Sequence, residues 1–247
     1  MPAAGYRGGL SLYDAGESCC YWSSTPYESK FDDAYGLELD GSYHCVNWYS
    51  RSYGQSVRPV LGNQNESNKI NGYEYVDLGL PSGLKWATCN VGASSPEEYG
   101  DYYAWGEIET KSEYTNDNSK TYGKSMSDIS RNAMCDVACA KWGGSWRLPT
   151  KKELEELESK CKWKWTTING KKGYKVTGPN GNSIFLPAAG FRDGSWFFGT
   201  GNTSYYCSST PDESYDGYSY YLNFNSSVHD VYSNHRDRGR SVRPVSE

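Results

Sequence analysis

The amino-acid sequence predicts a loop-rich α+β protein with short strands and two helices. Segments 127–142 and 150–161 have the spacing of apolar residues that is typical of helices. Elsewhere short apolar runs alternate with clusters of Gly, Asn, Ser and Asp, which indicates strands joined by turns. The core must be largely aromatic, because the 247 residues include 23 Tyr and 9 Trp but few aliphatic side chains.

One block of the sequence occurs twice. Residues 2–60 and 187–245 align without a gap, and about 26 of about 59 aligned positions are identical. Both copies begin Pro-Ala-Ala-Gly, contain Ser-Ser-Thr-Pro-x-Glu-Ser and end Ser-Val-Arg-Pro-Val. The sequence thus contains its own comparison between positions that the fold keeps and positions that it lets vary.

The repeat predicts three parts of the chain. Residues 73–245 are expected to be a complete domain, long enough to bury a core, and 61–72 a polar linker. Residues 1–60 are expected to be the C-terminal half of a preceding, truncated unit. Because 187–245 follows 73–186 directly, these two should pair. Residues 1–60 would then lack their own helices and be partly disordered or depend on another chain.

Short strands are expected at the start of the complete domain. Residues 73–80 and 83–91 are apolar runs around a Pro-Ser-Gly turn, and 99–107 is an aromatic loop or strand. Later, 174–177 and 183–186 flank Gly-Pro-Asn-Gly-Asn, which predicts a β-hairpin.

Both helices carry start signals. Ser127 can cap the first, which should end at Gly143-Gly144. Its expected buried stripe is Ile129, Ala133, Val137 and Ala140. Thr150 and Glu153 form a capping box for the second. Its expected buried stripe is Leu154, Leu157 and Cys161.

The two blocks differ at alternate positions of one predicted strand. Tyr220, Leu222 and Phe224 face residues of the same character in the first block, whereas the residues between them do not. A period of two indicates a strand with one buried face, so the varying residues should form an exposed face. Tyr and Asn are typical of recognition surfaces. The candidate ligand-binding residues are Phe197, Phe198, Tyr215, Asp216, Tyr221, Asn223, Asn225, Tyr232, Asn234, His235 and Asp237. The alternative is that they are merely tolerated on the surface of a Tyr-rich protein.

Two shared residue pairs are expected to be structural. His44 and His229 are equivalent and should be hydrogen-bonded within the fold. Arg58 and Arg243 should form an ion pair or bind carbonyl groups near the end of each block.

Charge and motifs exclude several function classes. The net charge of −5 offers no basic stripe for nucleic acid, and no run is long and apolar enough to span a membrane. The residues at the start of the chain do not form a signal peptide. The eight Cys and three His show no zinc-ligand spacing, and we find no catalytic constellation. We therefore expect no metal, no cofactor and no enzymatic activity.

The combined motifs resemble the Fibrobacter succinogenes major paralogous domain, a family of surface proteins in Bacteroidetes-type bacteria. The motifs that carry the resemblance are Gly-Asp-Tyr-Tyr-Ala-Trp-Gly-Glu at 100–107, Trp-Gly-Gly-Ser-Trp-Arg-Leu-Pro-Thr at 142–150, Gly-Tyr-Lys-Val at 173–176, Ser-Ile-Phe-Leu-Pro-Ala-Ala-Gly-Phe-Arg at 183–192 and Ser-Val-Arg-Pro-Val at 241–245. The family is similar to the C-type-lectin-like fold of formylglycine-generating enzymes and of the variable proteins of diversity-generating retroelements. The resemblance implies two helices flanking short twisted antiparallel sheets, and a ligand face in the C-terminal half.

The resemblance implies a secreted or cell-surface module that binds a protein or glycan ligand, with other repeats of the family as further partners. The varying residues are of types that adenine-directed mutagenesis produces, although Trp22, Lys30 and Glu38 are not, so ordinary divergence of paralogues is an alternative. A second alternative is a structural or adhesive repeat without a discrete ligand. A third is an oxidoreductase of the formylglycine-generating type, which would need a cysteine pair where only Cys207 is present.

Overall fold

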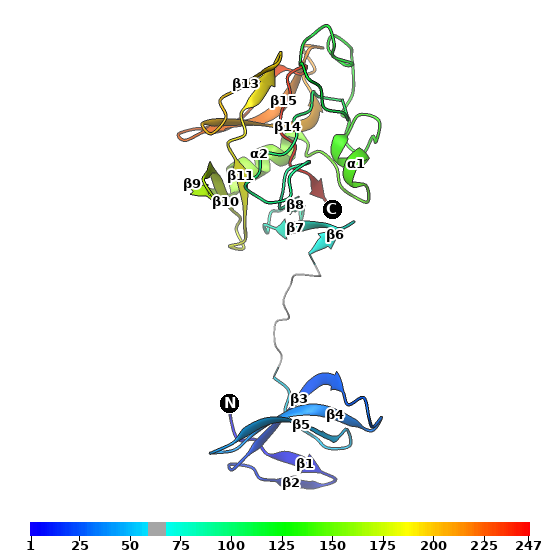
Figure 1. The fold of residues 1–247 in the computed structure, drawn as a ribbon, viewed down its shortest axis with the longest axis vertical. Helices are drawn as coiled ribbons and strands as arrows, with labels where there is room; N and C mark the ends of the chain where they lie inside the picture. The colour runs from blue at the N-terminus through cyan, green and yellow to red at the C-terminus, as the bar shows by residue number, and fades with distance from the viewer. Residues whose placement is uncertain (59–67) are drawn as a thin grey trace. The chain divides into compact units, whose positions relative to one another are not determined.

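A computed structural model describes residues 1–58 and 68–247. The chain divides into two compact units, Met1–Gln64 (unit 1) and Asn65–Glu247 (unit 2), shown in Figure 1. Most of the expected linker, 61–67, lies outside the described residues. Lys69–Ile70 forms strand β6, which pairs with β7 (Tyr73–Asp77) of unit 2.

Unit 2 is built around a three-stranded antiparallel sheet. Its strands are β14 (Thr203–Pro211), β15 (Tyr218–Asn225) and β16 (His229–His235), with β15 in the middle. We call the side with Leu222 and Phe224 the inner face of this sheet. The inner-face residues are Tyr206, Tyr220, Leu222, Phe224, His229 and Val231. The opposite side is the outer face.

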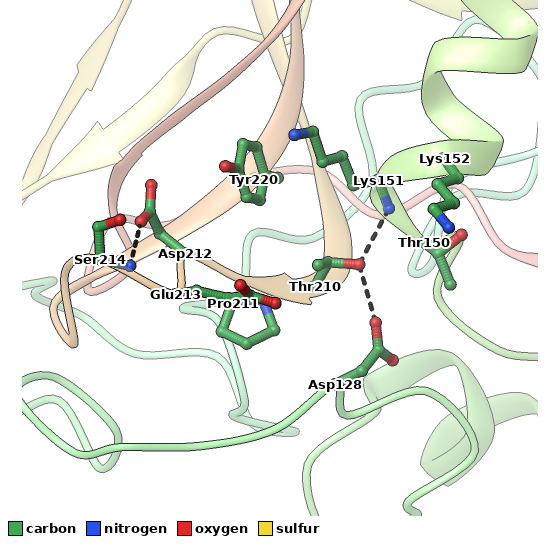
Figure 2. A pocket seen from close by; sticks show the side chains of 10 residues that line it. All are labelled: Asp128, Thr150, Lys151, Lys152, Thr210, Pro211, Asp212, Glu213, Ser214 and Tyr220. Atoms are coloured by element: carbon green, nitrogen blue, oxygen red, sulfur yellow. Dashed lines mark hydrogen bonds between the residues drawn. The ribbon is translucent and has the colours of Figure 1, made fainter.

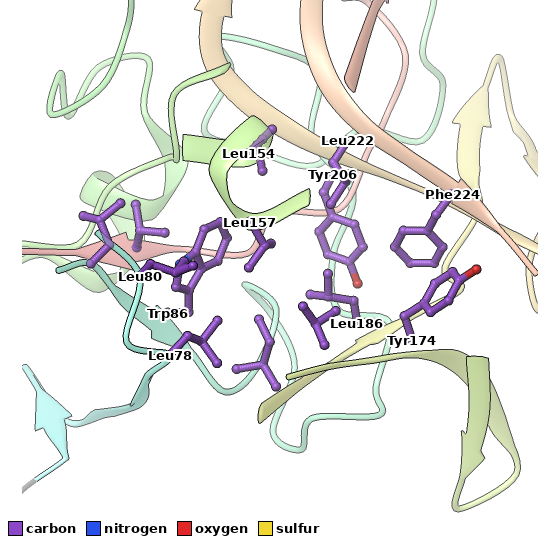
Figure 3. Close-up of a cluster of buried hydrophobic side chains, with 14 of the residues drawn as sticks. Leu78, Leu80, Trp86, Leu154, Leu157, Tyr174, Leu186, Tyr206, Leu222 and Phe224 are labelled. Atoms are coloured by element: carbon purple, nitrogen blue, oxygen red, sulfur yellow. The ribbon is translucent and has the colours of Figure 1, made fainter. Parts of the chain in front are cut away.

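A second layer covers the inner face. It consists of helix α2 (Lys151–Lys160) and the antiparallel sheet of β9 (Lys162–Ile168), β10 (Lys171–Thr177) and β11 (Ser183–Pro187). We call these elements the covering layer. Figure 3 shows Leu154 and Leu157 of α2 beside Tyr206 and Leu222, with Phe224 near Tyr174 of β10. The main core of unit 2 therefore lies between the covering layer and the inner face.

A further sheet completes unit 2. Its strands run in the order β17 (Val245–Ser246), β8 (Lys85–Ala87), β7 and β6. A short hairpin of β12 (Phe191–Asp193) and β13 (Trp196–Phe198) stands beside β14. Among the described residues, neither helix has the length and apolar character that a membrane crossing requires.

The α2 prediction is confirmed in detail. The Thr150 hydroxyl accepts from the Glu153 N–H at 3.3 Å, and the Glu153 carboxylate accepts from the Thr150 N–H at 2.7 Å. Leu154 and Leu157 are buried. The β10–β11 hairpin is likewise confirmed, with Val176 opposite Ile184.

The first helix is much shorter than predicted. Helix α1 spans only Val137–Trp142, because its cap is Asp136 rather than Ser127. The Asp136 carboxylate is fully buried and accepts from the N–H groups of Ala138, Cys139, Arg131 and Leu148. This carboxylate fixes the helix start. The preceding residues form turns, in which Arg131 has a φ of 65°.

The α+β prediction, with two helices flanking short twisted sheets in a C-type-lectin-like arrangement, is wrong. Strands and bridges account for 42% of the described residues and helices for 7%, in many small antiparallel sheets. Of the two helices in the described residues, α1 is six residues long, and α2 packs on β14–β16. The structure is thus mainly β, and the apolar spacing at 127–136 comes from packed turns.

Unit 1 contains the strands that the repeat implies. A hairpin of β1 (Tyr6–Gly8) and β2 (Ser11–Tyr13) accompanies a sheet of β3 (Cys19–Pro26), β4 (Asp33–Leu39) and β5 (His44–Ser50). The pairings repeat those of unit 2, down to the irregularity between Trp22 and Pro26 that matches the one between Cys207 and Pro211. One fold element therefore occurs twice.

Candidate functional site

Aromatic rings cross the outer face of unit 2 in a continuous row. Phe198 lies 5.4 Å from Phe191, Phe191 lies 4.8 Å from Tyr205, and Tyr205 lies 5.5 Å from Tyr221, all measured between ring centroids. Tyr232 is the cross-strand neighbour of Tyr221. We call these five residues the aromatic strip. Its residues lie on five strands, β12 to β16.

A glycine turn joins the β12–β13 hairpin to the sheet. Gly190 has a φ of 68° and pairs with Ser204 of β14, and a Cβ there would lie 2.1 Å from the Phe198 carbonyl oxygen. Only glycine allows so close an approach. Gly5 repeats this geometry in unit 1, with a φ of 64°. The turn therefore places Phe191 and Phe198 beside Tyr205.

Tyr221 is not exposed, contrary to the prediction. Its exposed fraction is 6%, because the Arg240 guanidinium lies 4.2 Å from its ring centroid and Tyr205 packs on another side. Tyr221 thus supports the strip from within. Tyr232, by contrast, is 51% exposed and Phe198 45%.

Amide and carboxylate groups lie on the same face as the strip. Asn223 is paired with Asp230 across β15 and β16, and Asn234 follows Tyr232 by two residues. Asn225 belongs to the turn instead, since its side-chain oxygen accepts from the N–H groups of Ser227 and Val228. Asp40 accepts from Ser42 and Tyr43 in the same way in unit 1. Asn225 therefore has a structural role.

The remaining predicted residues lie apart from the strip. His235 pairs with Tyr218 on the other side of the sheet and stacks on Tyr122 at 5.7 Å. Asp237 is buried, 3.6 Å from His235 Nδ1, so its carboxylate is not available at the surface. Tyr215 is exposed but contacts Tyr218, and Asp216 is its exposed neighbour. The structure thus divides the predicted site into two groups.

The sequence analysis omitted three aromatic residues of this region. Trp196 is 73% exposed beside Phe197, whose ring lies 4.7 Å from the Arg192 guanidinium. Phe191 and Tyr205 belong to the strip. Tyr205 faces Cys20 in the alignment, so the test of alternating variation, applied to β14, would have identified it.

A cavity of about 500 Å³ lies on the inner side, at the N-terminus of α2 (Figure 2). The Lys151 ammonium lies 4.0 Å from the Tyr220 ring centroid, and the Lys151 N–H donates to Thr210 Oγ1 at 3.0 Å. Asp128 accepts from the hydroxyls of Ser209 and Thr210. Burial acts to raise the pKa of Asp128, but hydrogen bonds from Ser130, Thr210 and Ser209 outweigh it and lower that pKa.

The walls of this cavity are scaffold. The residues that β14 and β15 contribute are nearly all identical in the two blocks, and only Asp212 differs, facing Tyr27. The shared lining residues are Thr210, Pro211, Glu213, Ser214 and Tyr220. The contacts of Lys151 with Thr210 and Tyr220 join α2 to the sheet. Variation between the blocks thus affects Tyr205, Tyr221 and Tyr232 of the strip more than the cavity.

The shared His229 and Arg243 are structural, as predicted. His229 stacks on Trp163 at 4.5 Å, and its Nδ1 lies 3.1 Å from a Glu158 carboxylate oxygen. Buried Arg243 donates to the carbonyl oxygens of Ala87 and Phe185 at 3.0 and 2.9 Å. Both residues therefore join the C-terminal block to the rest of unit 2.

Residues 79–246 match the family described as Lcl C-terminal domain. The chain belongs to this family. It is a Fibrobacter-type paralogous family, which confirms the resemblance at that level and indicates a bacterial surface-type module. No curated protein and no solved structure matches the chain.

The Lcl C-terminal domain match includes both the covering layer and the aromatic strip. It begins in unit 2 and does not extend to unit 1. Within this family member, the internal repeat is therefore the comparison that separates scaffold from variable surface.

Proposed function

We propose that this Lcl C-terminal domain is a non-catalytic binding module of the bacterial surface, and that its aromatic strip binds a protein or glycan partner. The observation that carries the proposal is where the two blocks differ. Tyr205, Tyr221 and Tyr232 face Cys20, Gly36 and Asn47, whereas the inner face keeps its character. Positions that change on a constant scaffold are those expected to determine which partner is bound.

The chemistry of the strip supports this role. Tyr and Phe give large rigid contact areas at low entropic cost, and the neighbouring amides of Asn223 and Asn234 can adapt their hydrogen bonds. Phe198 and Tyr232 of the strip and the neighbouring Trp196 and Phe197 are exposed, and exposed apolar patches are typical of interaction sites. Their rings are positioned by strands that pack on a full core, so little ordering is needed when a partner binds.

The environment of Cys207 supports binding over oxidoreductase chemistry. The side chain is 3% exposed, and burial raises the pKa of its thiol to about 11. A reactive cysteine needs an accessible thiolate. At neutral pH this thiol is protonated and shielded from substrate.

The test is a binding screen of the full chain against glycan arrays and bacterial or host surface proteins, followed by affinity measurement. We expect Tyr232→Ala and Phe198→Ala each to raise Kd by at least about tenfold, the usual loss at an aromatic hot spot. Tyr215→Ala is the control, since Tyr215 is even more exposed than Tyr232 and Phe198 but lies outside the strip. Equal affinity in all three variants would instead favour the structural or adhesive repeat.

We also propose that the outer face is the hypervariable part of the protein, as in targets of diversity-generating retroelements. Gene sequences from several strains test this directly. Substitutions at adenine positions should concentrate in the codons for outer-face residues and spare Leu222, Phe224 and Val231. An even spread over both faces would indicate ordinary divergence.

A further inference from the structure

Unit 1 and unit 2 contain the same sheet in the same register. Leu37 pairs with Val46 and Leu39 with His44, as Leu222 pairs with Val231 and Phe224 with His229. Each inner-face residue of unit 2 thus has a defined counterpart in unit 1. The unit 1 inner-face residues are Tyr21, Tyr35, Leu37, Leu39, His44 and Val46.

In unit 2 this face is covered by specific contacts with the covering layer. Phe224 is fully buried among Trp163, Trp165 and Tyr174. The Glu158 carboxylate lies against His229, and Lys151 lies over Tyr220. The interface therefore combines an aromatic centre with a carboxylate and an ammonium at defined positions.

In unit 1 the β5 side of this face is open. Val46 is 68% exposed and His44 is exposed, whereas their counterparts Val231 and His229 are partly buried under α2 and β9. Arg58 is exposed, although its counterpart Arg243 is 1% exposed. Unit 1 thus presents a sheet face without the covering layer that packs on the equivalent face in unit 2.

Unit 1 has kept most of the residues of this face, although Leu39 and Trp48 stand where unit 2 has Phe224 and Ser233. Tyr21, Tyr35, Leu37, His44 and Val46 are identical to their counterparts. On the outer face, by contrast, Cys20, Gly36, Glu38, Cys45 and Asn47 all differ from theirs. An exposed Val46 and partly exposed Leu37 and Leu39 have no benefit for a free sheet, since apolar surface costs about 25 cal/mol per Å² left in water. The pattern is that of a face that is covered.

We propose that the inner face of unit 1 is a docking surface for a covering layer of the Lcl C-terminal domain type that has no C-terminal block of its own. The occupant has the chemistry of residues 151–187: a helix with Leu at i and i+3, followed by strands with inward Trp and Tyr. A carboxylate equivalent to Glu158 faces His44, an ammonium equivalent to Lys151 faces Tyr35, and backbone carbonyls face Arg58.

The chain's own covering layer is not the occupant. It already packs on β14–β16, where Phe224 has ring contacts with Trp163, Trp165, Tyr174 and Tyr206. Leu39 in unit 1 cannot replace those ring contacts. Exchange with a second copy would lose the same contacts, so a layer without its own C-terminal block is the better partner.

The test adds such a layer to the intact chain. Residues 73–185 are fused directly before Met1. Because Met1 aligns with Leu186, the junction then has the same spacing as Phe185–Leu186 in unit 2. Hydrogen exchange of peptides from β4 and β5 is compared with the parent chain. We expect exchange to slow by roughly 100-fold or more, as in a segment that opens only with its domain. Unchanged exchange in β4 and β5 would overturn the proposal.

Two neighbouring substitutions make the test specific. Val46→Asp and Asn47→Asp both change exposed residues, but on the inner and outer face respectively. Neither should alter exchange in the parent chain, because both side chains are in water there. In the fusion, Val46→Asp should abolish the added protection and Asn47→Asp should leave it intact. Loss of protection in neither variant or in both would equally contradict a docked inner face.

Discussion

Units 1 and 2 share a block of sequence, a strand order and a register, but they differ in what covers that block. In unit 2 the covering layer buries Phe224 and Leu222 completely, whereas Leu39 and Leu37 of unit 1 are only partly buried. The strands thus form without the layer, because their pairing and turns are local. Burial of the inner face depends on the covering layer, which precedes the C-terminal block in the sequence.

Unit 1 compensates within its own residues. Tyr27 stacks on Trp48 at 5.4 Å and meets the edge of Tyr35 at 5.4 Å, while Lys30 lies 5.6 Å from Trp48. In unit 2 the counterparts of Tyr27 and Trp48 are Asp212 and Ser233, and Lys151 lies over Tyr220 instead. The same sheet can thus be stabilised by an added layer or, less completely, by its own aromatic side chains.

The largest difference in stability between the two units is expected when equivalent core residues are truncated. Phe224→Ala should destabilise unit 2 by about 3–5 kcal/mol, since it leaves a large cavity under the covering layer. Leu39→Ala should cost clearly less, because Leu39 has no layer above it. Urea unfolding followed by hydrogen exchange in each unit measures both. Equal losses would mean that unit 1 is as well packed as unit 2.

The next largest difference in the free energy of unfolding is expected between variants of Arg243 and Arg58. Arg243→Ala removes a buried guanidinium and leaves the Ala87 and Phe185 carbonyl oxygens unpaired, so we expect a loss of about 2–4 kcal/mol in the free energy of unfolding. Arg58→Ala should change it by less than about 0.5 kcal/mol, because Arg58 is exposed. Thermal unfolding of both variants provides the measurement. A large effect at Arg58 would show that unit 1 already binds a partner.

The α2 cap affects unit 2 alone, because the described residues of unit 1 contain no such helix. Thr150→Ala should destabilise unit 2 by about 1 kcal/mol. Burial acts to raise the pKa of Glu153, but hydrogen bonds with Arg147 and the Thr150 N–H outweigh it and lower that pKa. Its stabilising contribution is therefore present above the unfolded-state pKa and is lost as the pH falls through the lower folded value. Glu153→Gln should make unit 2 less sensitive to acid, and an unchanged pH profile would contradict this account.

The smallest effect on stability should come from the outer face. Tyr232→Ala should change the unfolding free energy by no more than about 0.5 kcal/mol, while it weakens partner binding. Calorimetric unfolding of the variant beside the parent chain checks this. A loss above about 2 kcal/mol would make Tyr232 a structural residue rather than a contact residue.

Local signals predicted the elements that local chemistry determines. The Thr150–Glu153 capping box and the Gly-Pro-Asn-Gly-Asn turn both gave the observed structure, because their bonds join near neighbours. The Lys-Trp-Lys-Trp alternation at 162–165 was an equally clear strand signal for β9 that the prediction omitted. Helix α1 was overestimated because its start depends on Asp136, whose four partners include Leu148, twelve residues away.

The candidate site was predictable in part. Comparison of the two blocks identified the outer face and Tyr232, but not which varying residues reach solvent. Arg240, which lies beyond β16, covers the ring of Tyr221 on β15. Asp237 is buried beside His235. A period of two distinguishes the faces of a strand, yet it does not show what lies over either face.

The pairing of β17 with β8 has a geometric consequence for how unit 2 displays its surface. Val245 lies opposite Trp86, so the last strand closes against the first sheet of the unit, next to β7 and β6. Figure 1 shows β6 and β7 at one end of unit 2, and β13 and β15 at the other. A molecule attached to either terminus of unit 2 would lie on the side remote from the β12–β13 hairpin. Unit 2 can therefore be immobilised by a tag at either terminus, with β13 and β15 at the end remote from the support.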